Sequence, residues 1–259
     1  MAFPWLFQEN FEDGTLGNFD SETDTASQLD FPHYSELARF PWATCAPNTG
    51  AYCMRLALTG GTADAYLVEG DIDIAANVTR HAKFDIWFSP TFTGTADDTF
   101  NIFEALATST VEATFGARIV ASTDVINLGI GETAPTSFSA EALQRNVWYT
   151  VELTIDIDNA VANDGTIDLF VTRAGDAAQT TVSAAQVASL DQGAVTTARL
   201  GIQDHLSTTT GVILIDNFIF DEDRVFPGAR YSLHPVLTKS GHAFVGPGHL
   251  DIAGLLTDE

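Results

Sequence analysis

The chain has 259 residues, a length that suits one large β-sandwich or two small domains, and we expect one sandwich followed by a tail. Hydrophobic residues make up 45% of it and include 18 Phe and 4 Trp, enough apolar surface for a substantial core, so disorder of the whole chain is excluded. Its 35 acidic residues face only 11 basic ones, and a net charge of −24 disfavours binding to nucleic acid or to anionic membrane surfaces.

The pattern of apolar residues predicts an all-β protein. Apolar and polar residues alternate in short runs separated by Gly, Asn, Asp, Thr and Pro, which is typical of an antiparallel two-sheet sandwich. We predict eleven strands, at residues 5–11, 52–58, 64–69, 82–88, 99–105, 111–120, 124–129, 147–156, 166–172, 195–203 and 211–220. Two short segments, 139–145 and 183–190, each begin with a serine that can cap a first turn, and we predict that they are helical connectors.

Targeting signals and cysteines are sparse. The first seven residues lack the basic and apolar regions of a secretory signal, and no later stretch approaches the ~20 apolar residues that span a bilayer. We therefore expect no Sec-dependent export and no membrane insertion. Cys45 and Cys53 flank a Pro-Asn-Thr-Gly turn, where they are able to form a disulfide bond and equally able to remain buried thiols.

Three segments carry a resemblance to a known superfamily. They read NFEDGTLGNF at 10–19, NVWYTVELTID at 146–156 followed by DGTIDLFV at 164–171, and IDNF at 215–218 within the closing strand. They resemble the opening, the Trp-bearing strand with its hairpin, and the last strand of concanavalin A-like lectin and glucanase domains, which include laminin-G-type jelly rolls. The resemblance implies a jelly-roll sandwich over residues 1–223. Such domains serve as glycosidases, lyases, lectins and virion parts, so the function must be argued from sites.

The resemblance also suggests where a catalytic site would lie. One glucanase branch carries two catalytic glutamates on a strand reading Glu-x-Asp-x-x-Glu or Glu-x-Asp-x-Glu, and the nearest match is Glu69-Gly70-Asp71-Ile72-Asp73. Alternation would place the three carboxylates on one sheet face, where repulsion can raise the pKa of one of them. The final Asp and the glycine weaken the match, and a strand end with solvated carboxylates is the simpler interpretation. We therefore expect that the chain is not an enzyme, with a glycosidase using Glu69 and Asp71 or Asp73 as the alternative.

Calcium is the one cofactor that the resemblance suggests. Related jelly rolls often join the first strand to the last through this ion, and Glu12, Asp13 and Asp216 occupy the matching phrases. Carbonyl groups and water would complete the six to eight oxygen ligands that calcium takes. The alternative is that these residues are ordinary turn and strand-end acids.

Aromatic residues gather in the long loop from Asp30 to Tyr52. Sugar rings pack on aromatic faces, so Tyr34 and Trp42 are candidate carbohydrate-binding residues, although aromatics at this density also hold a loop onto a core. Trp87 and Trp148 lie in alternating strands and are expected in the core. The six histidines lack ligand spacing, and we expect them to be ordinary surface or loop residues.

Residues 224–259 form an extended C-terminal arm in this prediction. Gly and Pro breaks exclude a long helix, while the arm is too apolar for a free linker. We expect it to dock on other virion proteins or on copies of this chain through Phe226, Tyr231, Phe244, Leu250 and Leu255. The alternative is that the arm folds over its own sandwich.

These features together favour a structural protein. The lack of a signal, the exterior type of fold, the Thr- and Ala-rich but Lys-poor composition and the arm predict a non-catalytic head decoration protein or tail adhesin. Its place would be the virion surface after synthesis in the host cytoplasm, with glycans as a further class of partner. The alternatives are a polysaccharide-active glycoside hydrolase and a free carbohydrate-binding module.

Overall fold

The computed structural model describes residues 7–37, 50–70, 72, 74–95, 97–139, 142–158, 163–174, 181–222, 236–237 and 243–244. Its strands are β1 (Phe7–Glu9), β2 (Ser21–Asp24), β3 (Leu29–Asp30), β4 (Met54–Thr59), β5 (Ala65–Glu69), β6 (Thr79–Phe88), β7 (Asp98–Ala107), β8 (Thr110–Val120), β9 (Val125–Gly131), β10 (Ser137–Phe138), β11 (Trp148–Asp156), β12 (Gly165–Arg173), β13 (Thr181–Leu190), β14 (Thr197–Gln203), β15 (Thr210–Asp221), β16 (Val236–Leu237) and β17 (Ala243–Phe244). One short helix, α1 (Tyr34–Leu37), precedes β4.

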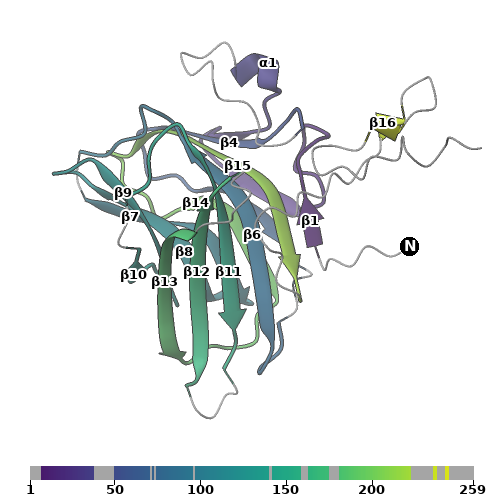
Figure 1. The fold of residues 1–259 in the computed structure, drawn as a ribbon, viewed down its shortest axis with the longest axis vertical. Helices are drawn as coiled ribbons and strands as arrows, with labels where there is room; N and C mark the ends of the chain where they lie inside the picture. The colour runs from purple at the N-terminus through teal and green to yellow at the C-terminus, as the bar shows by residue number, and fades with distance from the viewer. Residues whose placement is uncertain are drawn as a thin grey trace, which may run out of the picture.

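Two antiparallel sheets packed face to face form a sandwich (Figure 1). The eight-stranded sheet has the order β13-β12-β11-β6-β15-β4-β3, with β1 also paired to β15, and the seven-stranded sheet has the order β10-β9-β8-β7-β14-β5-β2. The closing strand β15 lies beside the first strand, with Phe7 opposite Phe220 and Glu9 opposite Phe218. The predicted two-sheet antiparallel sandwich is confirmed.

The core lies between the sheets and is built by alternation. In β6, for example, Phe84, Ile86 and Phe88 are fully buried on the inward side. The ring of Phe218 lies at the centre of an aromatic group, with ring centroids 5.8–6.2 Å from those of Phe7, Phe19, Phe84 and Phe103. Each ring buried in this way stabilises the fold by about 1.5–3 kcal/mol.

The outer face of the eight-stranded sheet is also largely buried. Leu37, Cys53, Trp87, Val212 and Leu214 form a second apolar cluster there, against which Trp148 packs. The cluster confirms that Trp87 is buried, on the outer side of this sheet. Cys53 is buried as well, and Cys45 lies outside the described residues, so the disulfide question stays open.

The prediction for residues 183–190 was wrong, because this segment belongs to a strand. β13 pairs with β12 along its length, for example Ala185 with Leu169 and Val187 with Ile167. Alanine favours helices in isolation, but pairing with an existing sheet edge outweighs this weak preference. The other predicted helix is absent from the described part of 139–145, where Leu143 instead makes a bridge with Ile126.

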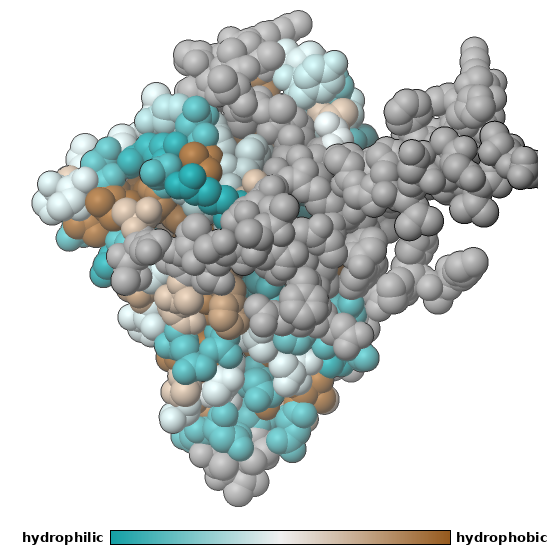
Figure 2. All heavy atoms as spheres, in the orientation of Figure 1, coloured by the Kyte–Doolittle hydropathy of each residue, from teal (hydrophilic) through white to brown (hydrophobic). Residues whose placement is uncertain are grey.

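The described surface is mixed in hydropathy. On the side seen in Figure 2, hydrophilic and hydrophobic areas alternate among the described residues. No helix among the described residues is long and apolar enough to cross a membrane.

Candidate functional site

The outer face of the seven-stranded sheet carries a group of buried polar side chains. In β14, Ala198, Leu200 and Ile202 point into the core, so Arg199 and Gln203 point outward. In β5 the same alternation sends Ala65 and Leu67 inward and leaves Tyr66 on the outer side. Alternation alone therefore brings Tyr66, Arg199 and Gln203 to one face.

A break in alternation adds Asn101 and Glu104 from β7. In a regular strand, residues three apart point to opposite faces. Here the pairing of β7 shifts between Asn101 and Phe103, and both Ile102 and Phe103 are buried in the core cluster. This β-bulge places Asn101 and Glu104 on the same outer face, opposite Gln203 and Arg199 respectively.

Glu104 lies at the centre of this group, which we call the Glu104 cluster: Tyr66, Asn101, Glu104, Arg199 and Gln203. Nδ2 of Asn101 donates to Oε1 of Glu104 over 2.8 Å, and Nη1 of Arg199 donates to Oε2 over 3.1 Å. With its amide nitrogen turned toward the carboxylate, Gln203 donates to Oε2 over 2.6 Å. Glu104 is only 3% exposed, so three donors surround one buried carboxylate.

Burial is the largest influence on the pKa of Glu104. Desolvation of the carboxylate raises its pKa, and the hydrogen bond from Asn101 and the charge and hydrogen bond of Arg199 oppose that shift. The negative charge of Asp204 adds to the rise. A carboxylate with a raised pKa can exchange a proton at a higher pH than an ordinary glutamate.

Arg199 lies between Glu104 and the solvent. Its side chain is 31% exposed, and its guanidinium carbon lies 4.9 Å from the centre of the Tyr66 ring. A molecule that approached this face would meet Arg199 and Tyr66 before Glu104.

A second arginine and an aromatic ring lie farther along the same face. Gly129 of β9 is covered by Phe138, because a Cβ added there would lie 2.5 Å from the Phe138 ring. Gly116 of β8 is covered in the same way by Pro135, at 2.7 Å. The guanidinium carbon of Arg118 lies 4.2 Å from the centre of the Phe138 ring. Segment 134–138 thus lies against the glycines of β8 and β9 and forms the border of the face.

His205 lies in the loop after β14, which fits the expectation of surface or loop histidines, but it is buried. It is 3% exposed and lies two residues after Gln203 in the chain. Its Nδ1 atom is buried and has no hydrogen-bond partner among the described residues.

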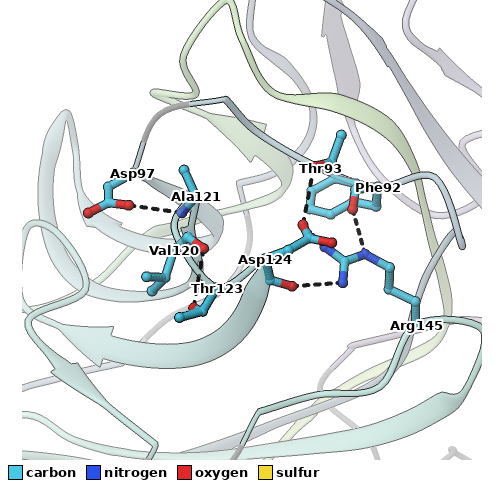
Figure 3. A network of polar contacts seen from close by, with 8 residues as sticks. All are labelled: Phe92, Thr93, Asp97, Val120, Ala121, Thr123, Asp124 and Arg145. Carbon is cyan, nitrogen blue, oxygen red and sulfur yellow. Dashed lines mark hydrogen bonds and ion pairs between the residues drawn. The ribbon is translucent and has the colours of Figure 1, made fainter.

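The polar network in Figure 3 has a structural role. Arg145 donates from Nε to the Phe92 carbonyl over 2.5 Å, and from Nη1 and Nη2 to the carbonyl and carboxylate of Asp124 over 2.9 and 2.6 Å (Figure 3). Thr93 donates to the same carboxylate. Phe92 and Thr93 lie in the β6–β7 connection, Asp124 in the β8–β9 connection and Arg145 in the β10–β11 connection. These contacts therefore hold three connections together.

Of the carboxylates predicted for catalysis, only Glu69 is described, and it is not part of the Glu104 cluster. Glu69 has the same orientation in β5 as the core residues Ala65 and Leu67, which is opposite to that of Tyr66. It is 5% exposed. Asp71 and Asp73 lie outside the described residues.

The predicted calcium ligands each have other contacts. Glu12 accepts the Ala51 N–H over 2.9 and 3.0 Å, Asp13 accepts from the N–H and hydroxyl of Thr15, and the buried Asp216 accepts the Asn217 N–H over 2.8 Å. Among the residues that the structure describes, no group of three or more His, Cys, Asp or Glu is arranged to hold a metal ion. Calcium at this junction stays a prediction.

Two other sets of predicted residues are only partly described. Tyr34 is 51% exposed on α1, with its ring centre 4.2 Å from that of His33, while Trp42 lies outside the described residues. Of the predicted assembly residues, Phe226, Tyr231, Leu250 and Leu255 also lie outside them, and Phe244 is described only as part of the β16–β17 pair. Carbohydrate binding at Tyr34 and assembly through the arm stay predictions, as does the virion surface.

Comparisons with known proteins give matches in structure only. No family model and no curated protein matches this sequence. Among solved structures, the chain is similar to a marine PL-14 alginate lyase from Aplysia kurodai, with a TM-score of 0.57 and 10% identity over 85% of this chain and 99% of that one. It is also similar to a carbohydrate esterase from the Shiga toxin-encoding bacteriophage phi24B, with a TM-score of 0.52 and 12% identity over the same shares. Identities this low show a common fold.

These two structures overturn the expectation that the chain is not an enzyme. That expectation treated the jelly roll as the architecture of a structural or binding protein. Both of these proteins of the same fold are enzymes that act on carbohydrates. The architecture therefore gives no reason to exclude catalysis.

Proposed function

We propose that this chain is a carbohydrate-active enzyme that binds a polysaccharide across the outer face of the seven-stranded sheet and uses Glu104 for proton transfer. The observation that carries the proposal is the position of Glu104. It is a buried carboxylate with a raised pKa that points away from the core, among three side-chain donors. Titratable groups perturbed in this way are common at catalytic sites.

The rest of the Glu104 cluster supports binding of a sugar. Arg199 and the amides of Asn101 and Gln203 supply N–H donors for the oxygens of a ligand, and Tyr66 supplies a ring on which an apolar sugar face can pack. The fold adds support, because the alginate lyase and the phage esterase share it at TM-scores above 0.5.

The chemistry of the cluster favours elimination or ester cleavage over hydrolysis by two carboxylates. Glycosidases of the usual kind place a second carboxyl group roughly 5–10 Å from the first, with both at the scissile bond. Glu104 is the only carboxylate among the five residues of the cluster, and the nearby Asp204 affects it through charge.

A panel of alginate, pectate, acetylated xylan and β-glucan tests the proposal. Elimination is followed by the ultraviolet absorbance of unsaturated sugar ends, hydrolysis by reducing ends and deacylation by released acetate. We expect turnover on one substrate and a loss of at least about a hundredfold in Glu104→Gln, because general acid–base catalysis contributes about that factor or more.

The matched control is Glu222→Gln, which removes the same charge from an exposed ion pair with Arg80 of the other sheet. Its rate should equal that of the unmodified protein, and both variants should keep their melting temperature within a few degrees. No turnover on any glycan, or full activity in Glu104→Gln, would contradict the proposal.

A further inference from the structure

Arg118 of β8 is a cation without an acidic partner in the part of the chain that the structure describes. This is unusual in a protein with 35 acidic residues. Four other described arginines form ion pairs with carboxylates: Arg55, Arg80, Arg145 and Arg199. Arg173 donates to the amide oxygen of Gln144, and its side chain is exposed on the other sheet.

The surroundings of Arg118 hold its guanidinium in place. Its cross-strand neighbours are Thr99 and Asn127, and Phe138 lies against its flat face at 4.2 Å. Its Nε is buried and has no acceptor among the described residues. Stacking on a ring holds a guanidinium by its face, and with Nε buried the Nη groups are the donors left for a ligand.

We propose that Arg118, held by Phe138, is a subsite for an anionic group of the glycan, either the carboxylate of a uronic acid or a sulfate ester. Both groups present paired oxygens that match the fork of a guanidinium. This inference rests on the proposed function and names its substrate class. Of the two described arginines on this face, Arg199 is already neutralised by Glu104, so Arg118 supplies the unbalanced positive charge.

The charge of the whole protein strengthens the need for such a subsite. A net charge of −24 repels a polyanion at long range, so an anionic glycan can bind only where a local cation is free. β8 and β14 are separated by β7, which puts these strands roughly 10 Å apart, and Arg118 lies four residues along β8 from Thr114, the residue opposite Glu104, which adds roughly 13 Å along the strand. An oligosaccharide can therefore contact the anion subsite and the Glu104 cluster together.

Titration calorimetry with matched ligands tests the inference. The ligands are an oligouronate and its neutral methyl ester of equal length, and a sulfated oligosaccharide and its desulfated form. Arg118→Gln should weaken binding of one charged ligand by about tenfold or more, the usual value of a charge-assisted hydrogen bond, and leave its neutral form unaffected. Loss with the oligouronate assigns a carboxylate, and loss with the sulfated ligand assigns a sulfate ester.

Arg173→Gln is the matched control, because it removes the same charge from the other sheet and should leave every affinity unchanged. Equal affinities in Arg118→Gln and the unmodified protein, or equal weakening of charged and neutral ligands, would overturn the subsite and leave the proposed function standing. No binding of any glycan by the unmodified protein would overturn both. If Arg118→Gln does not fold, Arg118→Lys replaces it, with a smaller loss expected for the charged ligand alone because lysine keeps the charge but not the fork.

Discussion

His205 lies in the connection between β14 and β15, where burial lowers its pKa. Desolvation of the imidazolium is the largest cause, and the negative charges of Asp98, Asp64 and Asp204 oppose it. Asp98 is itself 3% exposed and accepts the Leu206 N–H over 2.9 Å. The folded protein therefore accommodates His205 in its neutral form.

This shift predicts a loss of stability in mild acid. A histidine whose folded-state pKa lies below its unfolded value of about 6.5 contributes stability that is present above that pH and is lost as the pH falls toward the folded-state pKa. Urea unfolding at about pH 7.5 and about pH 5.5 should show a larger loss in the unmodified protein than in His205→Gln. The raised pKa values of Glu9 and Glu104 change the stability in the opposite direction as the pH falls. Both proteins keep these two residues, so their contributions cancel in the comparison. An equal loss in both proteins would refute the assignment to His205.

At the scale of the element, β13 offers a direct test of strand against helix. Ala185 and Val187 are half-buried against the core, and Ala184 is exposed. Ala185→Asp should lower the free energy of unfolding by about 1–3 kcal/mol, because it buries a charge at the sheet edge. Ala184→Asp is the matched control and should change it by no more than about 0.5 kcal/mol. Equal effects at the two positions in urea unfolding would contradict the alternation.

Alternation explains which elements the sequence could predict. β6, β8, β11 and β15 were foreseen because one of their faces is apolar, whereas Ala-rich β13 lacks that contrast. The Glu104 cluster was missed for two reasons. A β-bulge decides that Asn101 and Glu104 share a face, and the ion pair of Glu104 with Arg199 joins residues 95 positions apart. Register between distant strands cannot be read from local periodicity.

At the scale of the whole molecule, the outer face of the eight-stranded sheet bears on the two expectations for residues 224–259. Lys83, Asp85 and Glu152 alternate with core residues in β6 and β11, so they point outward, yet they are 7%, 5% and 0% exposed. Charged side chains on an uncovered sheet face keep contact with water. Described neighbours bury part of this surface, since Thr150 and Asn217 donate to Asp85 and Lys83 is the cross-strand neighbour of Glu152. An arm that covers its own sandwich would bury this face further, and this is the expectation to test.

Truncation after Asp223 tests this expectation. The shortened chain should melt at least about 5 °C lower or aggregate, because loss of about 1 kcal/mol already shifts the melting temperature by several degrees. Scanning calorimetry and light scattering measure the two effects. An unchanged melting temperature together with lost assembly would instead favour docking of the segment on another subunit.

The position of β13 at the edge of its sheet has a consequence for colloidal behaviour. An edge strand offers unpaired N–H and C=O groups to other chains, and proteins usually protect such edges with lysine, proline or a bulge. Thr181–Leu190 has no charged residue and no proline. One of its carbonyls, that of Gln186, accepts the Ser137 hydroxyl over 2.9 Å. The two register shifts in its pairing with β12 protect this edge in part, and mutual repulsion between highly charged copies adds a second barrier to edge-to-edge pairing. That barrier falls as the pH approaches the isoelectric point near 4.2 or as salt screens the charges.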